Sequence, residues 1–288
     1  MFTRSANTLS AQSNTSTQVQ VLRGKTTVPM AHGSTSTHVQ ILRGTTAIAP
    51  LADRSSIVNK CSDCNMRKLC LPTGLSSIEQ QQLDSLVTTH KRVARGESLF
   101  RENDKFEFLY VIRSGFFKTS ILIEDGRDQV TGFNMAGDML GLDGIGSGVH
   151  NCDAVALEDA EVCVISFRQY ERLSHTIESL QTHLYKLMSR EIARDHSMML
   201  LLGTMRAEER LAAFLLNLSE RFTARGYSPR EFILRMTREE IGSYLGLKLE
   251  TVSRMFSKFH DDGLVNAQQK HINIKDVTKL RQVIGNCH

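Results

Sequence analysis

The stretch Arg238-Glu-Glu-Ile-Gly-Ser-Tyr-Leu-Gly-Leu-Lys-Leu-Glu-Thr-Val-Ser-Arg-Met-Phe-Ser257 decides how the end of the chain folds. Its pattern is typical of two short helices joined by a tight turn. Gly242 is small where such helices cross, and Gly246 can adopt the positive φ that the turn needs. Apolar residues recur where the helices would pack together, at Ile241, Leu245, Leu247, Val252 and Met255. The stretch therefore predicts a helix-turn-helix, which places its second helix in the major groove of DNA.

Three polar residues share one face of the second predicted helix, at Glu250, Ser253 and Arg254. Glutamate can accept from a cytosine amino group, arginine can bond guanine in two places, and serine can reach a base or a phosphate. Lys248 and Arg238 are predicted phosphate partners, which hold register without reading sequence. A merely solvated helical face is the alternative interpretation of the first three residues.

The ends of this motif are also predicted. Thr237 and Glu240 have the spacing of a capping box at the start of the first helix. After the second helix, Gly263-Leu-Val265 and Lys270-His-Ile-Asn-Ile274 have the pattern of two short strands, which would form a wing. The last segment, residues 206–288, is therefore expected to be a winged helix-turn-helix domain.

Upstream of this domain the sequence predicts a long helix over residues 174–205. Apolar residues recur there at steps of three and four, namely Ile177, Leu180, Leu184, Leu187, Met188, Ile192, Met199 and Leu202. One long apolar stripe favours a coiled-coil dimer interface. Packing of the helix on its own chain is the alternative.

Short strands with glycine-rich turns dominate the region from Lys91 to Phe167. The strand segments are residues 108–113, 116–123, 129–133 and 162–165, and Asp125-Gly126 predicts a hairpin turn between two of them. Evenly spaced short strands of this kind are typical of a closed roll or barrel.

Three cysteines lie close together before this region, at Cys61, Cys64 and Cys70. A four-iron iron–sulfur cluster needs four thiolates, so Cys152 or Cys163 would have to supply the fourth. Spacing alone leaves open a zinc site or a thiol redox switch. Neither a nucleophile motif nor a substrate-pocket motif accompanies the cysteines, so we expect a protein that is not an enzyme.

Composition limits the class of protein. The 288-residue chain is 41% hydrophobic and 23% charged, enough for folded cores. Residues 51–205 carry 17 basic and 21 acidic groups, whereas residues 206–288 carry 14 basic and 10 acidic ones. An acidic middle followed by a basic end is typical of a sensor module joined to a nucleic-acid module. No apolar run suits a membrane span or a secretory signal, so a cytoplasmic protein with reduced thiols is expected.

The first 55 residues are rich in Ser, Thr, Gln and Gly and contain a repeat. Thr15-Ser-Thr-Gln-Val-Gln-Val-Leu-Arg-Gly24 recurs as Thr35-Ser-Thr-His-Val-Gln-Ile-Leu-Arg-Gly44. Two copies are too few for a solenoid. Little in the segment can be buried, so disorder is expected, and no function is assigned to it. Residues 56–173 are then expected to form the sensor domain.

Taken together, these motifs resemble the Crp/FNR superfamily of bacterial regulators, and within it the oxygen-responsive FNR-type regulators. The resemblance covers about residues 60–285. It is carried by the cysteine run and by segments 110–115, 131–138, 143–148, 207–214 and 250–254, with Phe222 and Ser228-Pro-Arg-Glu-Phe232. It implies an α+β fold: an antiparallel β-roll like that of cyclic-nucleotide-binding domains, a long dimerisation helix and a C-terminal winged helix-turn-helix.

The resemblance also implies a cofactor and a switch. In the family a [4Fe–4S] cluster is held by the three amino-terminal cysteines and a fourth at the position of Cys163, which leaves Cys152 and Cys287 without a family role. The intact cluster promotes homodimerisation, with Ile192 and Asp195 on the long helix as the switch. Asp195 would face its symmetry mate, and the two like charges would oppose the dimer until the cluster shifts the packing. Oxygen destroys the cluster and releases DNA.

The implied partners are palindromic double-stranded DNA with half-sites like TTGAT, and RNA polymerase, which the loop Arg225-Gly-Tyr-Ser-Pro-Arg-Glu231 would face. Cyclic-nucleotide binding is disfavoured. Members that bind these nucleotides place an Arg-Ser or Arg-Thr pair at the cyclic phosphate, and the corresponding residues here are Asn151-Cys152. The phosphate would lose its bidentate charged partner.

Overall fold

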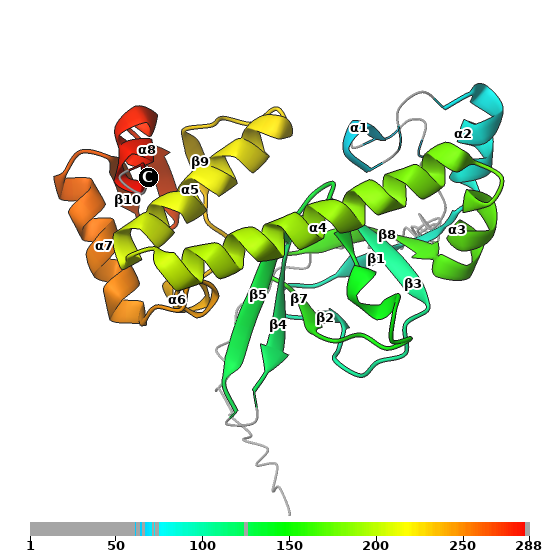
Figure 1. Ribbon diagram of the computed structural model, residues 1–288, viewed down its shortest axis with the longest axis horizontal. Coiled ribbons are helices and arrows are strands. Elements are labelled where there is room, and N and C mark those ends of the chain that lie inside the picture. Colours follow the sequence, from blue (N-terminus) through cyan, green and yellow to red (C-terminus); the bar gives the residue numbers. More distant parts are fainter. Residues whose placement is uncertain are drawn as a thin grey trace, which may run out of the picture. The chain divides into compact units, whose positions relative to one another are not determined.

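The computed structural model describes residues 61, 64, 67–70, 72, 75–123 and 126–285. The repeat-containing extension over residues 1–55, together with Asp125 and Cys287, lies outside the described residues. Within them the expected fold class is confirmed: a β-roll is followed by a long helix and a C-terminal winged helix-turn-helix (Figure 1).

Two four-stranded antiparallel sheets form the roll, with strand orders β1-β8-β3-β6 and β2-β7-β4-β5. The strands are β1 (Val87–Val93), β2 (Ser98–Phe100), β3 (Phe108–Ser114), β4 (Phe116–Leu122), β5 (Asp128–Met135), β6 (Met139–Leu140), β7 (Asp153–Ala156) and β8 (Ala160–Ser166). A short 3₁₀ turn, η2 (Leu142–Gly144), follows β6. Apolar side chains such as Ile112, Phe117 and Val162 are fully buried between the sheets, as the alternating pattern requires.

Helices flank the roll in sequence. The short α1 (Arg67–Cys70) and α2 (Ser77–Asp84) precede β1, and α3 (Phe167–Ser174) and α4 (Glu178–Thr204) follow β8. Ser76 caps α2 and forms a capping box with Glu79. Figure 1 shows α4 as the longest helix, running from the neighbourhood of α3 to that of α5.

The single apolar stripe expected on α4 is in fact two surfaces. Leu180 is buried against the roll, and Leu184 packs on the same cluster. Ile192 and Met199, in contrast, are 54% and 62% exposed. Steps of three and four residues satisfy both surfaces, which is why the sequence pattern merges them. The helix itself ends at Thr204.

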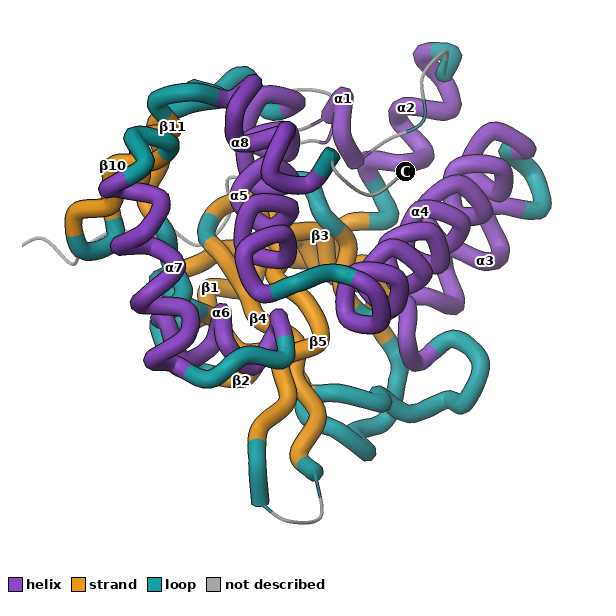
Figure 2. The backbone as a smooth tube through the Cα atoms, turned by 60° about the vertical axis from the view of Figure 1, so that its left-hand side comes forward, coloured by secondary structure: helices purple, strands orange, loops and turns teal. Residues whose placement is uncertain are grey.

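The C-terminal domain has the predicted motif with an added helix on each side and one added strand. Its elements are α5 (Ala207–Ala224), β9 (Glu231–Ile233), α6 (Arg238–Leu245), α7 (Leu249–Asp261), β10 (Val265–Gln268), β11 (His271–Ile274) and α8 (Val277–Ile284). The wing is a three-stranded sheet of order β10-β11-β9, because β9 pairs with β11. Figure 2 shows α5 and α8 side by side, and α6 and α7 as consecutive helices of the motif.

The local signals of the helix-turn-helix are confirmed. Glu240 N donates to Thr237 Oγ1 at 3.1 Å, and Thr237 N donates to Glu240 Oε2 at 2.7 Å. Gly246 has φ +64°. A Cβ at Gly242 would lie 2.6 Å from the carbonyl oxygen of Leu247, so only glycine fits there.

One apolar cluster crosses from the roll into the C-terminal domain. Phe133 packs against Phe214 and Tyr244, with ring centroids 6.0 and 5.1 Å away. Phe116 and Met135 of the roll belong to the same cluster. None of the described helices is long and apolar enough to cross a membrane.

Candidate metal centre and nucleic-acid interface

Four cysteines line one small cavity of about 30 Å³. Cys61 and Cys64 precede α1, Cys70 is its last residue, and Cys163 lies in the middle of β8. Pairing of β8 with β1 and β3 fixes the position of Cys163 on the sheet. The structure thus brings together the four residues predicted as metal ligands, although a gap of more than 90 residues separates Cys163 from the others.

The cavity is mostly apolar, and burial in it raises the pKa of the thiols. Burial raises the pKa of Cys61 to about 11 and those of Cys70 and Cys163 to about 12, and the neighbouring cysteines raise them further. These three thiols are therefore protonated near neutral pH. A bound cation would have to supply the charge that stabilises the thiolates.

Charged groups lie at one side of this cavity. His90 and Arg113 both line it. His90 Nδ1 lies 3.1 Å from Arg113 Nη1, and Arg113 lies 3.5 Å from Glu161 Oε2. Burial and the nearby Arg113 lower the pKa of His90. Arg113 therefore provides a positive charge beside Cys163, whose thiolate form it favours.

The four sulfurs are not gathered around a single ion. Among the described parts of the chain, no group of three or more His, Cys, Asp or Glu side chains is arranged to hold one metal ion. A donor set of four cysteines suits an iron–sulfur cluster, whose several irons each take one protein thiolate.

Cys152 lies elsewhere in the roll. It packs on the apolar cluster between the two sheets, whereas Cys61, Cys70 and Cys163 pack on the cluster beneath α3 and α4. Its Sγ lies 3.7 Å from Asp143 Oδ2. The same carboxylate accepts from the backbone of Asn151, and the ring of His150 stacks on Phe100. Cys152 therefore belongs to an internally bonded loop, away from the cysteine cavity.

The predicted DNA-reading residues are available at the surface of α7. Glu250, Ser253 and Arg254 are all exposed, and so is Lys248, which precedes the helix. Arg254 makes one weak contact, to Thr251 Oγ1 at 3.4 Å. Lys258 differs, since it is bound to Glu208 of α5 at 2.6 Å.

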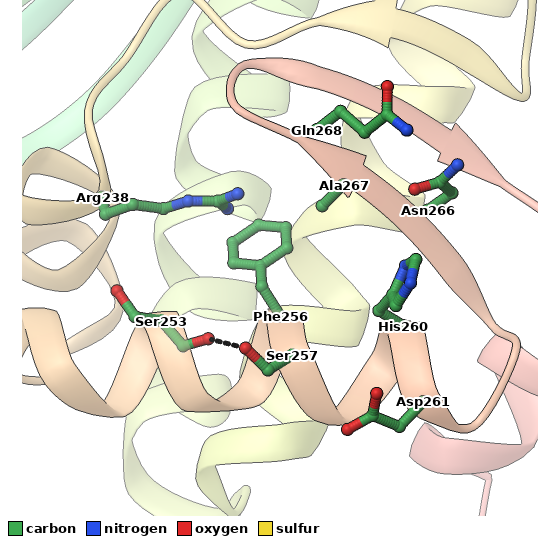
Figure 3. A pocket seen from close by; sticks show the side chains of 9 residues that line it. All are labelled: Arg238, Ser253, Phe256, Ser257, His260, Asp261, Asn266, Ala267 and Gln268. Carbon is green, nitrogen blue, oxygen red and sulfur yellow. Dashed lines mark hydrogen bonds between the residues drawn. The ribbon is translucent and has the colours of Figure 1, made fainter.

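A groove of about 540 Å³ lies between α7 and the wing (Figure 3). Arg238 forms part of it, with its guanidinium carbon 3.2 Å from the centre of the Phe256 ring. Its Nη2 donates to the carbonyl oxygen of Gln269 at 3.3 Å, and Nη1 has no hydrogen-bond partner in the part of the chain that the structure describes. Burial lowers the pKa of Arg238 to about 10, so it remains positive near neutral pH.

Sequence reasoning missed most of this groove. Besides Arg238 and Ser253, the polar side chains that line it are Ser257, His260, Asp261, Asn266 and Gln268. The wing was predicted as two strands, but its sequence pattern does not indicate which of its residues face α7. Ser253 and Ser257, three residues before and one residue after Phe256, were the available signal.

Ile192 and Asp195 lie on the outward surface of α4. Tyr185, Ile192 and Met199 are seven residues apart along the helix and are all exposed. Met188, Asp195 and Leu202 follow each of them by three residues. This alternation of three and four is the spacing of a coiled-coil interface, and Asp195 occupies one of its central positions.

Comparison with known proteins agrees with this arrangement. Residues 90–176 match the cyclic nucleotide-binding domain family, and residues 209–283 match the Crp-like helix-turn-helix domain family. The transcriptional regulatory protein btr of Bordetella pertussis is 48% identical over 225 residues, which cover 78% of this chain and 93% of that protein. The chain belongs to the Crp/FNR family of transcription regulators. The fumarate and nitrate reduction regulatory protein of Escherichia coli K12 is 45% identical, covering 78% of this chain and 90% of its own length.

A solved structure has a similar architecture. The structure of FixK2 from Bradyrhizobium japonicum is 29% identical and matches with a TM-score of 0.63, covering 68% of this chain and 96% of that one. The chain is therefore a DNA-binding transcription regulator, and α6 and α7 lie within its Crp-like helix-turn-helix domain.

Arg254→Ala should weaken binding to one specific base pair. The exposed guanidinium is free to bond a guanine in two places, and we expect a loss of about 1–3 kcal/mol that relaxes specificity at that position alone. Lys248→Ala is the matched control, since loss of a phosphate contact should weaken all sequences equally and reduce the salt slope by about 1. Fluorescence anisotropy with single-base variants of the duplex measures both. If Arg254→Ala weakens the binding of every duplex equally, Arg254 contacts the DNA phosphates and not a base.

Proposed function

We propose that this regulator senses oxygen through a [4Fe–4S] cluster held by Cys61, Cys64, Cys70 and Cys163. The observation that carries the proposal is that these four cysteines, and not Cys152, line one cavity. When bound, the cluster would supply an oxygen-sensitive link between the cysteines. The 45% identity to a fumarate and nitrate reduction regulatory protein supports the same assignment.

The cysteines would couple two parts of the chain. Cys61, Cys64 and Cys70 lie in the segment that contains α1, and Cys163 lies in a central strand of the roll. A cluster bound to all four cysteines would fix the amino-terminal segment against the sheet. Losing that cluster would release the segment, because α1 is only four residues long and cannot be stable alone.

The exposed surface of α4 would then form a homodimer. Two copies of the Tyr185, Ile192 and Met199 stripe would bury apolar side chains that are more than half exposed in one chain. Two copies of Asp195 would lie close together in the same interface and repel each other. The dimer would place two recognition helices about 34 Å apart on a palindrome with TTGAT-like half-sites. This function belongs to the cytoplasm, where thiols stay reduced.

The groove between α7 and the wing would receive the DNA backbone. Arg238 carries a positive charge there, and Ser257, His260 and Gln268 can donate hydrogen bonds. RNA polymerase would be reached through the loop after α5, where Tyr227 is 57% exposed. Arg225, at the start of that loop, cannot contribute, because its side chain is 7% exposed and bound to Asp138.

Removing the charge at Asp195 should favour the dimer in air. We expect Asp195→Ala to tighten aerobic dimerisation about tenfold or more, which corresponds to about 1.4 kcal/mol. Asp195→Asn should do nearly the same, because it keeps the size and removes the charge. Arg190→Ala is an off-interface control on the same helix. Sedimentation equilibrium measures the result, and an unchanged monomer–dimer balance in both Asp195 variants would exclude charge repulsion as the switch.

Anaerobic purification with iron and sulfide analysis, repeated after air is admitted, tests the proposed function. We expect about four irons and four sulfides per chain, with an absorption band that bleaches in air as the dimer dissociates. A colourless protein that carries zinc or no metal would assign the signal to zinc binding or thiol oxidation and would overturn the proposal.

A further inference from the structure

Asp138 lies in the turn between β5 and β6 and binds Arg221, in the last turn of α5, and Arg225, the residue that follows this helix. Its carboxylate accepts from Arg221 Nη2 and from Arg225 Nη2, both at 2.6 Å. It also accepts from the backbone N–H of Met135 at 2.8 Å, which fixes the shape of the turn. The side chain of Asp138 is only 16% exposed, so these are ion pairs largely removed from water.

The contact joins the roll to the C-terminal domain at more than one atom. Arg225 Nε donates to the carbonyl oxygen of Ala136 at 2.6 Å, and Arg225 Nη1 donates to that of Arg221 at 2.9 Å. All three nitrogens of the Arg225 guanidinium therefore donate hydrogen bonds, two to the turn and one to α5. A guanidinium held at this many points fixes the position of α5 relative to the turn.

The other side of the same turn touches the cysteine segment. Gly137 has φ +89°, and a Cβ built on it would lie 2.8 Å from Leu69 Cδ1 and 3.0 Å from Leu69 Cβ. Leu69 is the residue before Cys70 in α1. The absence of a side chain at Gly137 thus allows α1 to pack directly on the backbone that presents Asp138.

We infer that Asp138 is a positioning residue that carries the state of the cysteine centre directly to the DNA-binding domain, by a route separate from dimerisation. The inference rests on the proposed function for its signal. When one cluster binds the four cysteines, Leu69 packs on Gly137 and keeps Asp138 in place to bind Arg221 and Arg225. When the segment is released, the turn loses this support and α5 loses its fixed position.

A small displacement of the turn is enough to weaken both ion pairs of Asp138. Both ion pairs are at 2.6 Å and little exposed, so a shift of the turn leaves charged groups both poorly paired and poorly hydrated. The recognition helix is in the domain that α5 opens, and Lys258 of α7 is itself bound to Glu208 of α5. A change in the position of α5 therefore reaches the DNA-reading surface.

The test removes dimerisation from the comparison. In an Asp195→Ala background the chain is dimeric with or without the cluster, as sedimentation must show. The measured quantity is the ratio of DNA affinities of the iron-loaded and iron-free forms, on a duplex with two inverted TTGAT half-sites. We expect a ratio of about 5-fold or more, which falls to about 1 when Leu69→Ala or Asp138→Asn is added. General destabilisation does not change this ratio, because it affects both forms.

Glu158→Gln is the matched control. Glu158 also pairs a roll residue with the C-terminal domain, at 3.1 Å from Arg235, but the pair is more exposed. The ratio of the two DNA affinities should be unchanged in Glu158→Gln. A ratio of 1 in the parent, or an unchanged ratio in both the Leu69 and Asp138 variants, overturns the direct route while leaving the iron content, and with it the proposed function, intact.

A second measurement uses amide hydrogen exchange instead of DNA affinity. In the iron-loaded full chain, Leu69→Ala should accelerate amide hydrogen exchange in residues 133–140 and at the end of α5, because the turn loses its packing partner. In the iron-free chain the segment is already released, so the same substitution should change the exchange little. Unchanged exchange in both peptides of the iron-loaded chain would show that Leu69 does not support the turn.

Discussion

Cys163→Ala is expected to abolish iron and sulfide binding in the anaerobic protein, whereas Cys152→Ala should leave about four irons per chain. The reason is position: Cys163 shares a cavity with the three amino-terminal cysteines, and Cys152 packs in a different apolar cluster. The two residues are otherwise a close match. Each lies in the roll, each is partly buried, and burial raises the pKa of each to about 12.

Iron and sulfide analysis with the visible absorption spectrum distinguishes the two variants. Both should remain folded, because removing one sulfur from a partly buried position costs little stability. The reverse pattern, with iron lost from Cys152→Ala and kept in Cys163→Ala, would contradict the assignment of the fourth ligand. Loss from both would mean that iron retention depends on the roll as a whole.

Asp138→Asn is expected to lower the free energy of unfolding by about 3–5 kcal/mol near neutral pH, because it leaves Arg221 and Arg225 buried without a charged partner. Burial acts to raise the pKa of Asp138, and Arg221 and Arg225 outweigh it, so the pKa in the folded chain is lowered. Stability from such a carboxylate is present above the unfolded pKa of about 3.9 and disappears as the pH falls through the folded value.

The pH dependence separates this charge effect from a packing effect. The difference between wild type and Asp138→Asn should stay constant from about pH 7 to pH 5 and shrink below about pH 4. Urea denaturation at each pH measures it. A difference that persists unchanged at low pH would show that the amide disturbs the turn through its shape, without a contribution from charge.

Local signals in the sequence predicted the C-terminal motif well. The capping box at Thr237, the turn at Gly246 and the close contact at Gly242 each depend on residues within a few positions of one another. Four of the eight described strands of the roll, β3, β4, β5 and β8, were also predicted, because alternation and glycine turns are local, whereas β1, β2, β6 and β7 were missed. The two surfaces of α4 were not separable, since one periodicity serves both packing on the roll and an outward stripe.

Contacts between distant segments could not be predicted. Asp138 and Arg225 are 87 residues apart, and neither lies in a pattern that reveals a buried partner. Arg225 was assigned to an outward loop from resemblance, yet its side chain points to the roll. The gathering of four cysteines was expected from the resemblance only; spacing alone could not choose between Cys152 and Cys163.

The apolar cluster that crosses from the roll into the C-terminal domain has a consequence for how the molecule comes apart. Phe133 of the roll and Phe214 and Tyr244 of the other domain would all face water if the two were cut apart near residue 206. The described part of the chain should therefore melt as one cooperative unit, with a single calorimetric transition. An excised DNA-binding domain would expose an apolar aromatic surface and would tend to aggregate.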